Sequence, residues 1–397
     1  MKKNKASFIP LAIFYALIFM ARGGFGSYIG LYYSSIKLSN AEIGIIASVG
    51  SFIGLFGQPL WGGICDRAEN KNRILSLTLI LTALSIWFLP LSGKNFWLLV
   101  LASAFFGFFE NTVTPQSDSI AIELAHNADF NFSLIRTIGS LGFALMAAIA
   151  GNIFSRNIFY IFVVFSLLRI TSFFVSLLIP PVRGYKKKEN LARLWDIFKD
   201  KKLVYIYLYV FILSCTSGFF YSFHAIYSEE VGIGRQLLGL GIMAGSFSQF
   251  PFMLFFDWLY KKLGIVEILL LSGLTFTIRW FLYAVALTPN TIILLWLLHG
   301  GNYMVLYLCL AEYVSTNVAK ELRTRGQMVN AIILSGISSI FGSTIGGIIS
   351  QAIGIGSTFL LSSVICFLAV TGFFIVTRVK PEFRSDLLNN HKKELPV

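Results

Sequence analysis

Apolar segments of about 20 residues recur along the whole sequence and constrain its fold more than any other feature. They are separated by charge clusters and by turns rich in Pro, Gly and Asn. A helix of this length crosses the roughly 30 Å hydrocarbon core of a bilayer and satisfies its own backbone hydrogen bonds there. The sequence therefore predicts an all-α polytopic membrane protein with twelve transmembrane helices. The predicted spans cover residues 8–34, 41–63, 73–92, 95–118, 134–155, 157–180, 203–228, 236–258, 264–287, 291–315, 328–352 and 356–378.

The composition excludes an ordinary soluble protein, because 56% of the 397 residues are hydrophobic and only 13% are charged. That charged fraction is about half of what a soluble domain carries, so the outside of the molecule also needs an apolar solvent. The first apolar run continues to about Tyr33, which is too long for a signal peptide, and no small-residue cleavage site follows it. We expect a retained first span. The four cysteines are isolated in apolar runs and indicate buried packing residues.

The net charge of +13 follows the predicted topology. If the N-terminus is cytoplasmic, 24 of the 32 basic residues fall in the tails, the linker and the loops on that side. Four fall on the opposite side, and four lie within or at the edge of spans. Because basic residues accumulate in cytoplasmic loops, we expect a multi-pass protein of the cell membrane with both termini cytoplasmic. The basic surplus does not indicate a nucleic-acid partner.

A basic stretch between the sixth and seventh spans divides the chain into two halves. The predicted parts are a first six-helix bundle over 1–180, a cytoplasmic linker over 181–202, a second six-helix bundle over 203–380 and a cytoplasmic tail over 381–397. The tripeptide Gly-Ser-Phe recurs in the middle of the second and eighth spans, as a weak internal echo.

Arg22 lies in the middle of the first span, beside Gly23, Gly24 and Gly26. An ionisable residue at that depth is costly and indicates either a functional site or a structural ion pair between two helices. We interpret Arg22 as lining a polar cavity, with the structural ion pair as the alternative.

The fourth span supplies partners for Arg22, because Glu110, Thr114 and Asp118 recur every four residues on one helical face. Desolvation favours the protonated form of a carboxyl group, and a neighbouring Arg favours the ionised form. Such a carboxylate can therefore bind or release a proton when the conformation changes. Glu110, at mid-span, is the candidate proton carrier. Asp118 is predicted near the cytoplasmic end of its span, where a solvated carboxylate needs no special role.

The second half also carries ionisable residues within predicted spans. Arg279 and His299 lie in the middle of the ninth and tenth spans, although a lone His in an apolar helix is more often a packing residue. We interpret Arg169, in the sixth span, as structural. Small residues at helical spacing, such as Gly139 with Gly142, predict close helix packing.

Enzyme motifs for nucleotide, metal or nucleophilic chemistry are absent from the sequence, and no segment is long enough for a soluble ATPase domain. We expect no enzymatic activity, no cofactor and no metal. Energy would come from a gradient across the membrane.

The loop after the second span resembles the signature of the major facilitator superfamily. It reads Gly62-x-x-x-Asp66-Arg67 and continues through Lys71 to Arg73. The resemblance implies the major facilitator fold, and it implies that Gly62, Asp66, Arg67 and Arg73 form a conformational-switch loop. In that family the Asp helps to hold the halves together in one conformation.

The chain further resembles the lactose permease and phenylpropionate permease branch, in residues 43–66 and 136–143 and over nearly its whole length. The resemblance implies that Asp118 and Arg136 form a charged pair that contacts substrate, with Phe143 at the aromatic stacking position. Arg279 and His299 fall where the sugar permease has an Arg and a His, but the Glu one turn beyond that His is Asn302 here. The lactose proton site is therefore not reproduced, and we place proton coupling at Glu110 with Arg22.

The leading hypothesis is a secondary transporter that works by alternating access, as proton symport of a sugar, nucleoside or aromatic carboxylate. The alternative is proton-antiport efflux of a drug or metabolite. A passive channel, a lipid-handling scaffold and a membrane enzyme are the other classes considered. We expect a functional monomer whose partners are a small-molecule substrate, protons and the lipid bilayer. The predicted substrate-binding residues are Arg22, Asp118, Arg136, Phe143, Arg279, His299 and Asn302, and the predicted proton-coupling residues are Glu110 and Asp118.

Overall fold

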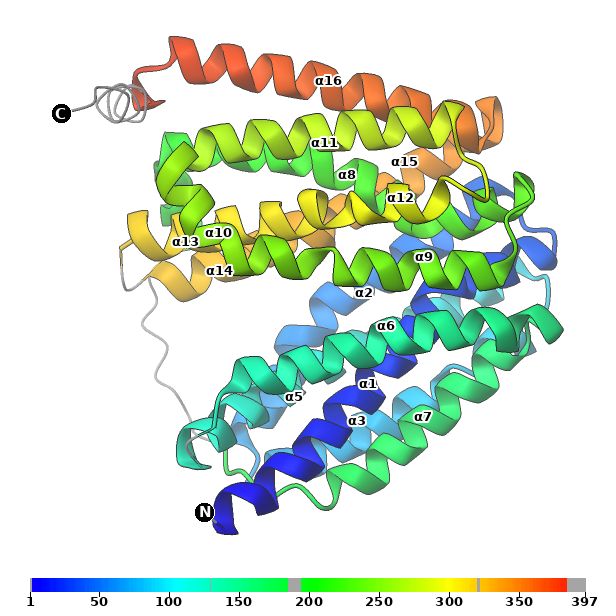
Figure 1. The fold of residues 1–397 in the computed structure, drawn as a ribbon. Helices are drawn as coiled ribbons and strands as arrows, with labels where there is room; N and C mark the ends of the chain where they lie inside the picture. Colours follow the sequence, from blue (N-terminus) through cyan, green and yellow to red (C-terminus); the bar gives the residue numbers. More distant parts are fainter. Residues whose placement is uncertain (1, 129, 185–193, 320–321, 384–397) are drawn as a thin grey trace. The chain divides into compact units, whose positions relative to one another are not determined.

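The computed structural model describes residues 2–128, 130–184, 194–319 and 322–383, and these form helices and short connections without a β-strand. The all-α prediction is confirmed. The helices of the first part of the chain are α1 (Lys2–Ser35), α2 (Asn40–Arg67), α3 (Lys71–Ser85), α4 (Phe88–Leu91), α5 (Phe96–Ala128), α6 (Phe132–Arg156) and α7 (Tyr160–Ser176) (Figure 1). The later helices are η1 (Leu194–Lys199), α8 (Lys201–Glu230), α9 (Arg235–Phe247), α10 (Gln249–Leu263), α11 (Ile265–Val285), α12 (Ile292–Leu297), η2 (Gly300–Met304), α13 (Val305–Asn317), α14 (Arg323–Ala331), η4 (Ile332–Ile337), α15 (Ser338–Ile353), α16 (Ile355–Val379) and η5 (Pro381–Phe383).

Several predicted spans are interrupted helices rather than continuous ones. The span Lys71–Leu91 joins α3 to α4, and Arg235–Leu263 joins α9 to α10. Two others contain a π-helical turn, η2 within Ile292–Asn317 and η4 within Arg325–Ile353. Such turns are frequent at functional sites in helices.

The structure yields eleven helical spans of sufficient length and apolar character among the residues it describes, where the sequence predicted twelve. The remaining predicted span, 157–180, contains the shorter apolar helix α7 of 17 residues. At 1.5 Å per residue α7 is about 25 Å long, at the lower limit for crossing the hydrocarbon core.

Contacts group the chain into two compact units. The first comprises Met1–Glu189 with Tyr221–Met243, and the second comprises Asn190–Phe220 with Ala244–Val397. The predicted division at the linker stays a prediction, and the segment Tyr221–Met243 is where the two divisions differ.

In the first unit α1 packs against α6 and α7, and α2 packs against α5. Close packing of α1 with α6 depends on Gly142, because a Cβ there would lie 2.7 Å from the Ala16 carbonyl oxygen. The sequence-based assignment of Gly142 to helix packing is confirmed. In the second unit the main pair is α11 with α16.

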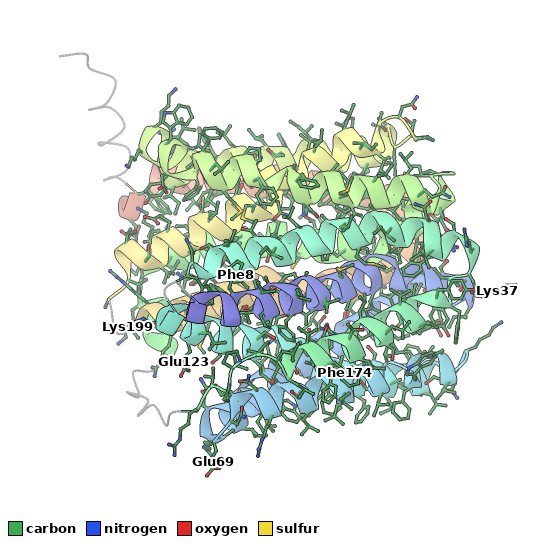
Figure 2. The ribbon with its side chains drawn as sticks, turned by 60° about the horizontal axis from the view of Figure 1, so that its bottom comes forward. Phe8, Lys37, Glu69, Glu123, Phe174 and Lys199 are labelled. Atoms are coloured by element: carbon green, nitrogen blue, oxygen red, sulfur yellow. The ribbon has the colours of Figure 1, made fainter. Side chains whose placement is uncertain are left out.

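Figure 2 shows the ends of the first unit. Phe8 lies in the first part of α1 and Lys37 follows the opposite end of that helix, and Glu69 and Glu123 lie toward the Phe8 end. Phe174 of α7 is 61% exposed on the outside of the bundle, among many exposed Leu, Ile and Phe side chains. In a soluble protein so many exposed apolar side chains would cause association, so they indicate the lipid-facing surface.

Candidate functional site

Three arginines contact the predicted polar face of α5, one at each of its three polar residues. Glu110, Thr114 and Asp118 are four residues apart, so each lies about 6 Å further along the axis than the last. The contacts are Glu110 with Arg169 of α7, Thr114 with Arg22 of α1, and Asp118 with Arg136 of α6. Three other helices therefore converge on this face.

Arg169, and not Arg22, forms the ion pair with Glu110. Arg169 Nη2 donates to Glu110 Oε1, and the Arg169 side chain is fully buried while that of Glu110 is 12% exposed. The guanidinium also lies over the ring of Phe165, 5.1 Å from its centroid. Among the residues that the structure describes, Glu110 Oε2 and the Nε and Nη1 atoms of Arg169 have no hydrogen-bond partner. The pair is therefore buried with three polar atoms unpaired, which is unusual for buried polar groups in proteins.

Arg22 is exposed in mid-helix and borders a cavity of about 270 Å³. Its Nη1 donates to Thr114 Oγ1 at 3.1 Å. The cavity lies among α1, α2, α4 and α5, with Glu110 and Asn111 on its wall and the rings of Phe25 and Phe106 beside them. Arg22 and Glu110, which the sequence placed in one site, thus line the same cavity.

Asp118 and Arg136 form the pair that the resemblance implied. Arg136 Nη1 donates to both carboxylate oxygens, at 3.0 and 3.1 Å, and Tyr15 OH donates to Oδ1 at 2.7 Å. Arg136 also stacks over Phe19, and its side chain is 43% exposed. Three arginines and two carboxylates are therefore gathered along one face of α5.

Phe143 lies seven residues after Arg136 and therefore on the same face of α6. It is half-buried, and its backbone packs against α1 at Gly23, where a Cβ would lie 2.5 Å from the Phe143 carbonyl oxygen. Its predicted stacking role stays a prediction.

In the second unit, Arg279 and His299 lie together in an enclosed position. Arg279 is 1% exposed, and its Nη1 lies 3.2 Å from His299 Nδ1. Aromatic rings surround the guanidinium, with centroids 4.5 to 5.6 Å from its central carbon, in Phe220, Trp280, Tyr283 and Trp296. Asn302, on the π-helical turn, can donate to the Leu298 carbonyl oxygen and accept from the Phe276 N–H. All three predicted residues are buried here, so their role in binding stays a prediction.

In the predicted switch loop, Lys71 rather than Arg73 is the inward cation. Lys71 Nζ lies 3.9 Å from Asp66 Oδ1 and 3.4 Å from Glu123 Oε2, and its side chain is 8% exposed. It also donates to Ser119 Oγ at 3.1 Å. Arg73 and Arg67 are exposed, and Gly62 has open space where a Cβ would lie.

Lys71, Asp66, Ser119 and Glu123 form what we call the switch cluster. The signature motif contains Lys71, but sequence reasoning included neither Lys71 nor Glu123 among the predicted switch residues. The sequence offered one signal for this cluster. Ser119 and Glu123 lie one turn apart on α5, directly after Asp118, and so share a face. The residues that the structure describes contain no group of three or more His, Cys, Asp or Glu suited to a metal ion.

Comparison with known proteins identifies the family to which this chain belongs. The model described as "MFS_1 like family" matches residues 8–361. The maltose permease of Geobacillus stearothermophilus is 26% identical over 375 residues, which are 92% of this chain and 93% of that protein. The probable 3-phenylpropionic acid transporter of Escherichia coli (strain K12) is 20% identical over 378 residues, with 94% and 97% covered.

A solved crystal structure of the nucleoside transporter NupG has the same fold. Its TM-score is 0.82 at 15% identity, and the match covers 94% of this chain and 99% of that one. Together these matches confirm the predicted superfamily, its twelve-helix fold class and the resemblance to the sugar and phenylpropionate permeases.

Proposed function

The chain belongs to the MFS_1 like family, and we propose that it is a proton-coupled symporter of a small organic solute. Like the permeases that it matches over nearly their whole length, it is a multi-pass membrane transporter and not an enzyme. The finer assignment rests on one observation. A buried and incompletely satisfied ion pair, Glu110 with Arg169, borders the same cavity as the exposed Arg22.

Arg22 is the proposed anchor for substrate. A guanidinium carries five N–H donors, and Thr114 uses one of them here. The remaining donors suit a carboxylate or a pair of hydroxyl oxygens, and the rings of Phe25 and Phe106 suit a flat or cyclic body. A sugar, a nucleoside and an aryl carboxylate all carry these groups, as do the maltose, nucleosides and 3-phenylpropionic acid named for the relatives.

Glu110 is the proposed proton carrier. Arg169 keeps its charge in proteins, so a proton that enters this pair binds to the Glu110 carboxylate. Neutral Glu110 no longer balances Arg169, and the local excess of positive charge then attracts the anionic or oxygen-rich end of the substrate toward Arg22. Binding of proton and solute would thus be coupled through one set of charges.

The experiment is uptake into proteoliposomes with an imposed pH gradient, acidic outside. Maltose, uridine and 3-phenylpropionate serve as labelled probes of the three chemical classes. We expect one class to accumulate above its external concentration and a protonophore to abolish that accumulation. Proton-driven loss of preloaded solute would instead identify efflux by antiport. Equilibration without accumulation under any gradient would contradict secondary active transport.

Arg22→Gln should raise the half-saturating concentration for uptake of the accumulated probe at least about tenfold. A charge-assisted hydrogen bond of this kind is worth about 1.5–3 kcal/mol. The matched control is Arg156→Gln, because Arg156 is exposed at the end of α6 and outside the cavity. Equal half-saturating concentrations for the Arg22 variant and the control would show that Arg22 does not bind the substrate.

A further inference from the structure

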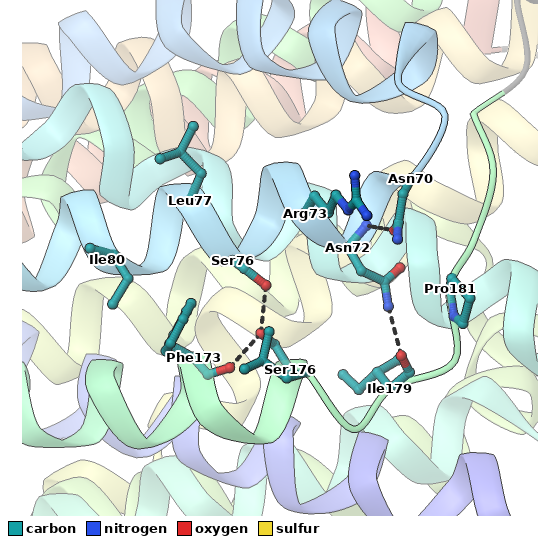
Figure 3. A pocket seen from close by; sticks show the side chains of 11 residues that line it. Asn70, Asn72, Arg73, Ser76, Leu77, Ile80, Phe173, Ser176, Ile179 and Pro181 are labelled. Carbon is teal, nitrogen blue, oxygen red and sulfur yellow. Dashed lines mark hydrogen bonds between the residues drawn. The ribbon is translucent and has the colours of Figure 1, made fainter.

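A second cavity, of about 500 Å³, lies between α3 and the end of α7 and belongs wholly to the first unit. The residues proposed for transport and the Lys71, Asp66, Ser119 and Glu123 cluster do not line it, and of the predicted switch loop only Arg73 does. One end is polar and carries Asn70, Asn72 and Arg73. The other end is apolar, with Leu77, Ile80 and Phe173, and the wall between the ends is formed by Ser76, Ser176, Leu177, Ile179 and Pro181. Figure 3 shows Arg73, Leu77 and Ile80 along α3 and Phe173 on the facing end of α7.

Fixed hydrogen bonds preform the groove. Asn72 Nδ2 donates to the carbonyl oxygens of Ile179 and Pro180, both at 3.0 Å, and Asn72 Oδ1 accepts from Val182 N–H. The Ser76 and Ser176 hydroxyls lie 2.8 Å apart and join the two helices across the groove (Figure 3). The segment after α7 is therefore held against α3.

One cation, Arg73, lines the polar end of the groove, and a second, Arg183, lies on the backbone segment held beside the start of α3. Arg73, in the first turn of α3, is exposed, and its guanidinium has no ion pair or hydrogen bond with the residues that the structure describes. Arg183 is exposed on the segment after α7, which the bond from Lys71 N–H to the Val182 carbonyl oxygen holds at 2.8 Å beside the start of α3. Two acidic residues near this end are exposed: Glu69, which extends away from the bundle in Figure 2, and Asp66, whose carboxylate lies 3.9 Å from Lys71 Nζ.

The order of these groups along α3 matches the order of groups in a phospholipid. Arg73 begins the helix, and Leu77 and Ile80 follow one and two turns deeper, about 6 and 10 Å along the axis. Leu77 and Leu177 are 48% and 60% exposed, so the apolar end is open to the surrounding acyl chains. The cation would lie at the interface and the apolar wall within the hydrocarbon.

We propose that this groove binds an anionic phospholipid, with its phosphate between Arg73 and Arg183 and one acyl chain along Leu77, Ile80 and Leu177. Charge complementarity selects this occupant. The sequence predicts this end of the bundle on the cytoplasmic side, where the leaflet is anionic and basic pockets between helices bind lipid headgroups. A zwitterionic lipid has the same chains but no net charge to pair with the two arginines.

The test is native mass spectrometry of the full chain in detergent, titrated with palmitoyl-oleoyl phosphatidylglycerol or with the phosphatidylcholine of the same chains. We expect the first to bind about 25-fold more tightly, which is about fivefold for each of the two cations. Arg73→Gln with Arg183→Gln should remove that preference. The matched control is Arg67→Gln, an exposed arginine of the same loop that does not line the groove.

The apolar end is tested by Ile80→Trp, which fills the groove without changing charge and should weaken both lipids. Glycerol 3-phosphate tests the headgroup alone and should not compete at concentrations equal to the lipid. Equal affinity for the two lipids, an unchanged preference in the double variant, or full competition by glycerol 3-phosphate would each overturn the proposal. These readouts are independent of transport, so they stand or fall separately from the proposed symport.

Discussion

Glu110→Gln should abolish proton-driven accumulation of substrate while leaving solute exchange in place. Glutamine has nearly the same shape and keeps an amide oxygen for Arg169, and the ring of Phe165 remains beneath the guanidinium. It cannot gain or lose a proton, so the variant is held in the state that corresponds to protonated Glu110. We expect the accumulation ratio to fall to about 1 and counterflow between equal solute pools to stay within about threefold of wild type.

Counterflow is the control for folding in this experiment, because a misfolded variant would lose exchange as well. Glu110→Asp provides a second control, since it keeps an ionisable group at the position and should retain part of the accumulation. Asp118→Asn separates the two predicted proton sites. Full accumulation by Glu110→Gln with its loss in Asp118→Asn would move the proton site to the Asp118 and Arg136 pair.

The polar face of α5 could be predicted from the sequence because a helix fixes which of its own residues share a face. The spacing of Glu110, Thr114 and Asp118 was sufficient. The partner of Glu110 could not be predicted in the same way. Arg22 and Arg169 both lie at mid-span, and the sequence gives depth along each helix but not which faces of different helices meet.

The switch cluster illustrates the same limit within one helix. Lys71 and Arg73 are two residues apart, which is about 200° around α3, so only one of them can face α5. The signature motif names both as basic positions and does not give the rotation of the helix. The π-helical turn that contains Asn302 was likewise not predicted from the sequence.

Breaking the buried pair from either side should destabilise the protein, and removing both charges should restore much of the loss. Arg169→Gln leaves the Glu110 carboxylate in a site that is 12% exposed, and Glu110→Gln leaves a fully buried guanidinium. Breaking a buried ion pair by removing one partner costs about 3–5 kcal/mol. We expect each single variant to unfold at lower temperature than wild type, and the double variant to be more stable than the sum of the two losses predicts.

The chain supplies its own probe for this measurement, because Cys65, Cys309 and Cys366 are free and buried. A thiol-reactive dye reports their exposure as the protein unfolds in detergent. The coupling energy of the double-mutant cycle should be at least about 2 kcal/mol, since the two side chains are in direct contact. Additive losses would mean that Arg169 stabilises α7 through Phe165 and packing alone. In that case Glu110 would have no fixed counter-ion, and the proposed proton site would lose its structural basis even if the variants still transported solute.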